Sequence, residues 1–230
     1  KFRLDNLFDS TYKIIESPDN INPDPLNFEV GERYKYIDKI KKYRKITNSF
    51  SALTCAYGKM SELKAVILCF DARFGAGRLG PVENENYLAA AEFACRVKAD
   101  VWITVFQSSG IDVHTGIVGL AGMPKTILAT NMIKEANIPT FAVACRAVAG
   151  GTFASAFFQH DIIIAEAKSV DNLLFSGLRV TSNILKSTEK IPEDFGTSLG
   201  LKQTGQIDVC LESRLELKDT ITKLANIILK

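Results

Sequence analysis

The chain has 230 residues, of which 47% are hydrophobic and 23% charged, a composition typical of one large globular domain or two small ones. Its formal net charge of +2 gives no indication of a nucleic-acid partner. No apolar run approaches the ~20 residues that a membrane-spanning helix needs, so we expect no membrane association.

Five cysteines are spread along the chain without any C-x-x-C pair: Cys55, Cys69, Cys95, Cys145 and Cys210. Four of them lie in or beside apolar runs, which favours free thiols in a reducing compartment. With two histidines and no ligand spacing among the cysteines, the sequence predicts no bound metal.

Residues 1–48 are polar, and we expect them to form an N-terminal segment that packs on the main domain, residues 49–230. Their basic run from Lys39 to Lys45 is more typical of a solvated helix face than of a phosphate-binding patch.

From Ser49 onward, apolar runs alternate with helical patterns. The sequence predicts strands over Ala52–Tyr57, Ala65–Phe70, Val101–Phe106, Thr140–Ala144 and Asp161–Ala165. It predicts helices over Asn84–Arg96, Gly116–Ala136, Thr152–Phe158 and Leu215–Leu229. Strands that alternate with helices indicate an α/β architecture with largely parallel strands. The runs at 101–106 and 140–144 are almost continuously apolar, as expected when both faces of a sheet are covered.

The string Phe74-Gly-Ala-Gly-Arg-Leu-Gly80 has the glycine spacing of a dinucleotide-binding fingerprint. In such a site the strand runs directly into the first glycine, whereas here residues 71–74 intervene. Asp100 stands about 20 residues further on, where the fingerprint has its acidic residue. However, it precedes a strand, so we expect it at the opposite edge of the sheet. A glycine-rich turn before a helix is therefore favoured over a dinucleotide site.

Two later junctions place backbone N–H groups at the end of a buried strand. One spans Phe106–Gly116 and contains Ser-Ser-Gly; the other spans Val143–Phe157, where Gly150 and Gly151 precede a helix. Unpaired N–H groups at a helix start attract negative oxygen, so two such sites can stabilise two oxyanions without a charged side chain. Tight turns in which glycine relieves backbone strain explain the same residues equally well.

These strings, in this order, resemble the carboxyltransferase beta subunit of bacterial and plastid acetyl-CoA carboxylase, a member of the crotonase superfamily. The similar strings are Arg3–Ser10, Asp24–Phe28, Phe74–Asn86, Ser108–Ile117, Ala149–Phe157, Asp161–Glu166 and Phe175–Val180. The resemblance implies an α/β crotonase fold, a spiral of β-β-α units related to that of Clp-type proteases. It also implies that the Gly75–Gly80 loop lies beside the active site and binds no dinucleotide.

The resemblance further implies a biotin-dependent acyl-thioester carboxyltransferase, of the type that converts acetyl-CoA to malonyl-CoA in fatty-acid biosynthesis. Carboxybiotin on a carrier protein is then the co-substrate that gives up CO2. An acyl-CoA or acyl-carrier thioester forms the enolate that captures it. The implied partners are an alpha-type carboxyltransferase subunit and the biotin carboxyl carrier protein, in the cytoplasm or in a plastid stroma.

By their positions in these strings, Gly110 and Ile111 are expected to form one oxyanion hole, and Gly150 and Gly151 the other. Six further residues are expected to contact substrate: Gly75, Gly77, Ser109, His114, Arg146 and Thr152. His114 is interpreted as a hydrogen-bonding residue at the pocket mouth rather than a proton donor. A contact to a CoA phosphate or carboxylate and a plain ion pair explain Arg146 equally well.

The chain departs from the family pattern in the stretch that follows the third strand. Ser109 replaces a glycine, which would strain the backbone if that position needs a positive φ. Asp112 replaces an arginine and inverts a charge beside the pocket, and His114-Thr115 replace Gln-Glu. The four-cysteine zinc ribbon that precedes the core in the family is not among these residues. These differences leave open a malonyl-thioester decarboxylase subunit and a non-catalytic partner subunit.

A hydrolase interpretation would use Ser155, which lies where Clp-type proteases carry a nucleophile. No histidine follows His160, which itself precedes a strand and is expected to be structural. Without a histidine base to activate the serine, hydrolysis is disfavoured.

Overall fold

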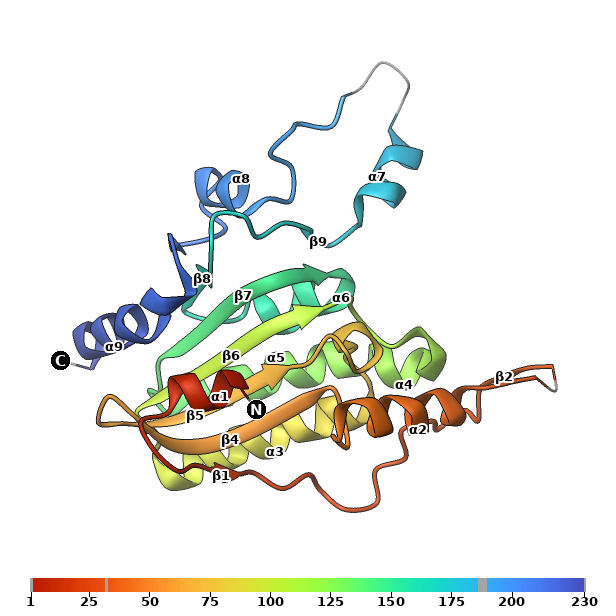
Figure 1. Ribbon diagram of the computed structural model, residues 1–230, viewed down its shortest axis with the longest axis horizontal. Helices are drawn as coiled ribbons and strands as arrows, with labels where there is room; N and C mark the ends of the chain where they lie inside the picture. Colours follow the sequence, from red (N-terminus) through yellow and green to blue (C-terminus); the bar gives the residue numbers. More distant parts are fainter. Residues whose placement is uncertain (1, 32, 186–189, 230) are drawn as a thin grey trace.

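A mixed sheet forms the centre of the computed structural model, which describes residues 2–31, 33–185 and 190–229 (Figure 1). The strand order is β1-β4-β5-β6-β7-β8-β10. The strands are β1 (Lys13–Ile14), β4 (Leu53–Met60), β5 (Leu63–Phe70), β6 (Val101–Ser108), β7 (Thr140–Ala149), β8 (Ile162–Ala165) and β10 (Val209–Cys210). β1, β4 and β5 pair antiparallel, and the neighbours from β5 to β10 pair parallel. All five predicted strands and the largely parallel sheet are confirmed.

β7 takes part in two pairings along its length. Its first half, Phe141–Ala144, pairs with β8, whereas Val148 and Ala149 pair with β9 (Leu173–Leu174). The register between β6 and β7 shifts between Phe106 and Ser108. The register shift of β6 and the change of partner along β7 therefore fall within the two junctions where the sequence predicts oxyanion sites.

Helices cover both faces of this sheet. The helices of the described residues are α1 (Phe2–Leu7), α2 (Tyr36–Thr47), α3 (Pro81–Val97), α4 (Gly116–Leu120), α5 (Gly122–Glu135), α6 (Gly150–Thr152), α7 (Leu178–Ile184), α8 (Ser198–Gln203) and α9 (Leu217–Ile228). α6 continues into the π-helical η3 (Phe153–Phe157), and short 3-10 turns form η1 (Gly75–Gly77), η2 (Val113–Thr115) and η4 (Arg214–Glu216). A small hairpin of β2 (Glu29–Val30) and β3 (Tyr34–Lys35) precedes α2.

The single helix predicted over Gly116–Ala136 is wrong in one respect, because it is divided into α4 and α5 at Ala121. Pro124 stands in the first turn of α5. A proline ring clashes with the carbonyl group four residues earlier, here that of Leu120, so one continuous helix cannot form.

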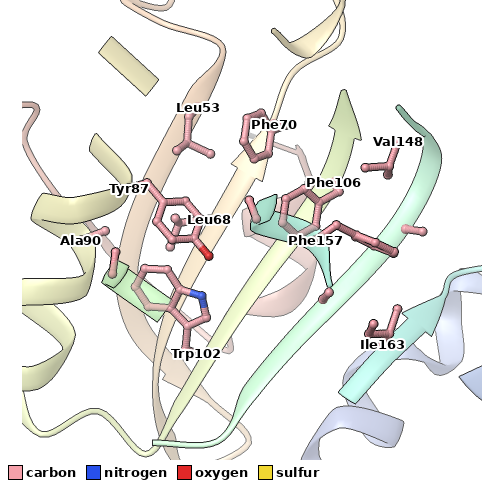
Figure 2. Close-up of a cluster of buried hydrophobic side chains, with 14 of the residues drawn as sticks. Leu53, Leu68, Phe70, Tyr87, Ala90, Trp102, Phe106, Val148, Phe157 and Ile163 are labelled. Carbon is pink, nitrogen blue, oxygen red and sulfur yellow. The ribbon is translucent and has the colours of Figure 1, made fainter. Parts of the chain in front are cut away.

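Side chains alternate along the central strands between two hydrophobic clusters. On β6, Trp102 and Phe106 face the cluster that contains α3 and α5, and Figure 2 shows them beside Tyr87 and Phe157. Val101, Ile103 and Val105 face the opposite cluster, which contains α1 and α9. This period of two explains why the strand reads as one continuous apolar run although each side chain meets only one face.

The N-terminal segment adds β1 to the edge of the sheet and contacts the rest of the domain through two helices. Leu4 and Leu7 of α1 belong to the cluster under α9, and Tyr36 and Ile40 of α2 pack with Phe74 in a third cluster. The division of the chain at residue 48 stays a prediction, but α2 lies directly against the glycine-rich loop.

Asp100 lies at the amino edge of the sheet. Its carboxylate Oδ2 accepts a hydrogen bond of 2.7 Å from the Lys64 amide, and its own amide donates to the Lys64 carbonyl. The sequence-based expectation is confirmed, and Asp100 cannot contact a ligand at the carboxyl edge.

His160 is buried between β6 and η3. Its ring nitrogens lie 3.2 Å from the Phe157 carbonyl oxygen and 3.1 Å from Thr104 Oγ1. Burial lowers the pKa of His160 from 6.5 to about 4. The histidine is therefore neutral in the folded protein at neutral pH, as a structural residue should be.

We predict that His160 makes the fold sensitive to acid. Between pH 6.5 and about 4 the unfolded chain binds a proton that the folded chain excludes, so the free energy of unfolding falls as the pH falls. The total loss should be about 3 kcal/mol. In His160→Gln this part of the pH dependence should disappear. Urea denaturation of both proteins from pH 7 to pH 4 checks this, and parallel curves for the two would contradict it.

Candidate active site

The loop between β5 and α3 lies against the end of β6. A Cβ atom at Gly77, where φ is 68°, would overlap the carbonyl oxygen of Gln107. The Ser109 amide donates a hydrogen bond of 2.9 Å to the Ala76 carbonyl. Glycine is required at position 77 because two stretches of backbone touch there, which is a structural role and not a ligand contact.

The segment after β6 pairs with the same loop. The Leu79 amide donates to the Gly110 carbonyl at 2.9 Å, and the Asp112 amide donates to the Leu79 carbonyl at 3.0 Å. In such a bridge the N–H of the residue between them, Ile111, points the other way. The Ile111 amide therefore faces away from Leu79.

The left-handed backbone in this segment falls on Gly110, whose φ is 115°, and Ser109 has no positive φ. The strain expected if Ser109 needed a positive φ is therefore absent. The replacement of glycine by serine leaves this turn unstrained.

The turn after β7 touches the turn after β6. A Cβ atom at Gly110 would lie 3.1 Å from the Ala149 carbonyl oxygen, and one at Gly150 would lie 3.4 Å from the Gly110 Cα atom. A Cβ atom at Gly151 would overlap the Ile111 side chain and lie 2.9 Å from Met123 Sδ. The structure thus brings together all four residues predicted to form the oxyanion holes.

A buried hydroxyl pair connects the two turns. Ser108 Oγ accepts a hydrogen bond of 3.2 Å from the Gly110 amide and donates one of 3.1 Å to Thr152 Oγ1. No acceptor for the Ile111 amide is present among the described residues. Of the two amides predicted for the first hole, that of Ile111 is therefore the available donor. Thr152 is fully buried, so its predicted contact to substrate has no exposed side-chain surface to use.

Four of the predicted residues line one cavity of about 210 Å³ at this edge: Gly75, Ser109, Ile111 and His114. Its other walls come from Tyr36, Tyr43, Arg78, Asp112 and Val113. Sequence reasoning missed Tyr36 and Arg78. The sequence signal for Arg78 is an arginine inside a glycine-rich loop, whereas no local sequence pattern marks Tyr36.

Arg146 lies apart from this cavity. It is exposed on β7 and lines a separate pocket of about 420 Å³ with Glu166 and Arg214. The structure therefore does not bring Arg146 to the two turns.

A buried group of charges lies beside Ile111. Arg78 pairs with Asp112, and their side chains are only 6% and 2% exposed. Tyr36 donates its hydroxyl to Asp112 Oδ2 at 2.5 Å and accepts a hydrogen bond from Arg78. Burial opposes the charge of Arg78, but the carboxylates of Glu83 and Asp112 outweigh it and raise the pKa of the guanidinium. The charge of Asp112 is thus compensated by an arginine from the glycine-rich loop.

His114 has hydrogen-bond partners for both ring nitrogens. Nδ1 lies 3.0 Å from Asp112 Oδ1, and Nε2 lies 3.1 Å from the Tyr34 hydroxyl. The ring stacks on Tyr36 with 4.0 Å between centroids and 6° between planes. These contacts favour the hydrogen-bonding role over the proton donor.

Ser155 is not arranged as a nucleophile. It is fully buried, and its hydroxyl donates to the Gly151 carbonyl at 2.6 Å. His160 is occupied by Thr104 and the Phe157 carbonyl, and it makes no hydrogen bond to Ser155. The geometry therefore disfavours a hydrolase that uses Ser155, as the sequence does.

All five cysteines are free, with Cys55 buried and the others half-buried. Within residues 2–31, 33–185 and 190–229, no three His, Cys, Asp or Glu side chains gather as metal ligands would. In the same part of the chain, no helix is both long and apolar enough to cross a membrane.

Comparison with known protein families and curated sequences gives consistent matches. The family model of the carboxyl transferase domain matches residues 36–228. The acetyl-coenzyme A carboxylase carboxyl transferase subunit beta of Bradyrhizobium diazoefficiens is 33% identical over 229 residues, which cover 99% of this chain and 70% of that protein. The subunit of the same name from Brucella canis is 35% identical over 231 residues, which cover 100% and 74%.

Solved structures share the fold at lower identity. A transcarboxylase 12S structure with hydrolysed methylmalonyl-coenzyme A has a TM-score of 0.71 at 17% identity, covering 97% of this chain and 40% of that one. A Pseudomonas malonate decarboxylase hetero-tetramer with malonate has a TM-score of 0.73 at 16% identity, covering 98% and 81%. The fold is that of the crotonase-like carboxyltransferases, as expected from the sequence.

We predict that Gly151 tolerates no side chain while Ile111 is present. Gly151→Ala should lower the free energy of unfolding by about 1–3 kcal/mol, because the new methyl group displaces the Ile111 side chain. In an Ile111→Ala background the same change should cost much less, giving a coupling of about 1 kcal/mol or more in a denaturation double-mutant cycle. Gly177→Ala is the control, since no atom lies within 4 Å of its Cβ position. Additive effects would contradict the contact between the two turns.

Proposed function

Since the chain belongs to the carboxyl transferase family, as a beta-type subunit of acetyl-CoA carboxylase, we propose that the cavity beside Ile111 binds the acyl thioester that accepts the carboxyl group. One observation carries this assignment of the site. The Ile111 amide has no acceptor among the described residues and lies where the two glycine turns meet.

In the proposed reaction, the thioester oxygen accepts a hydrogen bond from the Ile111 amide. Removal of an α proton places negative charge on that oxygen, and a fixed N–H donor stabilises the charge without reorganisation. The Gly110 amide, which already donates to Ser108, holds the turn in shape. Main-chain donors therefore do the work that a charged side chain would otherwise do.

The second oxyanion belongs to the carboxyl donor. Carboxybiotin on its carrier protein supplies CO2, and the biotin ureido oxygen takes the α proton of the thioester. The amides at the start of α6 have no acceptor within the helix, because the first N–H groups of a helix never do. We assign Gly150 and Gly151 to this ureido oxygen. Gly150 lies against Gly110, and Gly151 lies against the Ile111 side chain.

The cavity beside Ile111 supports the proposal that the substrate is a thioester of coenzyme A or of a carrier protein. Gly75, Ser109 and His114 lie on its walls and are proposed to contact the substrate near the acyl group. Arg146 lies in another pocket, so we assign it no contact with the acyl group. The names of the similar beta subunits favour acetyl-CoA as substrate and malonyl-CoA as product.

The partners of the site are proposed to be an alpha-type carboxyltransferase subunit and the biotin carboxyl carrier protein, as in cytoplasmic or plastid acetyl-CoA carboxylase. An apolar surface next to the cavity supports a protein partner. Its members are strongly exposed hydrophobic side chains on η2, α4 and α5: Val113, Ile117, Leu120 and Leu128. Exposed apolar side chains that gather on neighbouring elements are typical of protein-interaction sites, and Val113 also lines the cavity.

A malonyl-thioester decarboxylase subunit is the second candidate. A malonate decarboxylase structure has the same fold, and its reaction forms the same enolate while CO2 leaves. A non-catalytic subunit that only supports a partner's site would lack both activities.

One assay separates these functions. The purified chain, with an alpha-type subunit, is incubated with acetyl-CoA and carboxybiotin on the carrier, and separately with malonyl-CoA in the absence of biotin. We expect malonyl-CoA to form in the first mixture and no CO2 release in the second. Gly151→Val should lower the rate about 100- to 1,000-fold, as loss of an oxyanion donor does. CO2 release alone would select the decarboxylase, and no turnover in either mixture would select the non-catalytic subunit.

We predict that α4 contributes to the contact with the alpha-type subunit. Ile117 is 71% exposed, and its replacement by aspartate places a charge on the apolar surface. Ile117→Asp should weaken association at least about tenfold, measured by light scattering or sedimentation of the pair. Leu215→Asp is the matched control. Leu215 is 85% exposed just before α9, at the opposite end of the molecule from α4 (Figure 1). Equal weakening by both changes would contradict the assignment.

A further inference from the structure

The buried charges of Arg78 and Asp112 stand on the two strands of the bridge that orients Ile111. Arg78 directly precedes Leu79, and Asp112 directly follows Ile111. We propose that the Arg78–Asp112 pair, together with Tyr36, is a positioning group that fixes the direction of the Ile111 amide. This inference rests on the proposed function, because it gives that amide its catalytic role.

The pair closes a ring with the backbone. Leu79 exchanges hydrogen bonds with Gly110 and Asp112, at 2.9 and 3.0 Å, and the side-chain pair joins the same two strands. Rotation of the peptide unit between Gly110 and Ile111 would break the hydrogen bond from the Leu79 amide to the Gly110 carbonyl. The other contacts of the ring keep Leu79 in place to make that bond, so the ring holds the Ile111 N–H in one direction.

The Asp112 carboxylate is fully occupied by donors. Oδ2 accepts from Tyr36 and Arg78, and Oδ1 lies 3.2 Å from the His114 amide and 3.0 Å from its Nδ1. Burial raises the pKa of the Tyr36 phenol, so its proton remains available to Asp112. A carboxylate with both oxygens held in this way has a single orientation.

Stability alone does not explain a charge pair in this place. A buried ion pair is often no more stabilising than apolar residues of the same size, whereas removal of one partner leaves an uncompensated charge. Arg78 and Asp112 are also not isolated from the reaction, since both line the cavity beside Ile111. A role in fixing the direction of the Ile111 amide accounts both for the burial of the charge pair and for its place on the cavity wall.

Tyr36 extends this group into the N-terminal segment. It begins α2, stacks on His114 at 4.0 Å and lies 76 positions from Asp112 along the chain. The segment before the sheet domain thus takes part in the geometry of the proposed oxyanion hole.

The test uses the chain with its alpha-type partner and separates positioning from stability. Asp112→Asn and Arg78→Met should each lower the thermal midpoint, because each leaves one charge unpaired. The double variant removes both charges of the pair and should recover part of the midpoint, since the buried Glu83 keeps its hydrogen bonds from the Ala52 and Gly80 amides but loses the nearby guanidinium. We expect its kcat to remain about 100-fold low, as a misplaced catalytic donor would be, with KM for the thioester little changed. Tyr36→Phe, which removes only a neutral hydroxyl, should lower kcat about tenfold with KM unchanged.

Glu166→Gln is the control for loss of a buried carboxylate. Glu166 pairs with Arg3 at 2.8 Å beside α1, outside the cavity, so its change should lower the midpoint and leave kcat unaltered. Recovery of kcat together with the midpoint in the double variant would overturn the inference. So would unchanged kcat in a folded Tyr36→Phe.

Hydrogen–deuterium exchange distinguishes failure of the inference from failure of the proposed function. The hydrogen-bonded amides at positions 110 and 112 should exchange at least about tenfold faster in the double variant, even where its midpoint is recovered. If the unmodified protein carboxylates no thioester but this change in exchange is present, the proposed function fails and the positioning role stands. If the unmodified protein is active and exchange at these amides does not change, the positioning role fails.

Discussion

The backbones of three loops meet at the carboxyl edge of the sheet more closely than side chains allow. A Cβ atom at Gly77 would overlap the Gln107 carbonyl oxygen, and one at Gly151 would overlap the Ile111 side chain. This close approach requires glycine where the loops cross, and it brings Ile111 against the start of α6. The cavity at this edge and the proposed chemistry both depend on that approach of the loops.

The covering of the sheet on both faces explains why the site lies only at its edge. α3 and α5 exclude water from one face, and α1 and α9 cover the other (Figure 1). Charged groups along the central strands would lose their hydration without compensation. Arg78 and Asp112, which do enter the interior, are paired with each other and hydrogen-bonded. The edge of the sheet leaves the Ile111 donor without a protein acceptor among the described residues, so that it can meet a ligand.

The fold and the two turns follow from local sequence signals. Continuous apolar runs mark β6 and β7, and the glycines at 110, 150 and 151 mark the places where these strands end. Other features depend on residues far apart in the sequence. No local pattern brings Tyr36 to Asp112, and the pairing of Asp112 with Arg78 appears only when the loops are folded together. The position of Arg146, apart from the two turns, is hidden for a related reason, because an arginine near the end of a strand has the same sequence signal whichever way it points.

A site whose donors are main-chain N–H groups separates two properties that side-chain active sites usually combine: the choice of substrate and the stabilisation of the enolate. Every residue has an N–H group, so replacements at Ser109 or Val113 change the walls of the cavity without deleting the donors. The glycines at the crossing points are fixed by geometry. Such a scaffold can diverge in the acyl groups it admits while it keeps the same means of stabilising an enolate. The exchange of glycine for serine at Ser109, which adds no backbone strain, is a step of that kind.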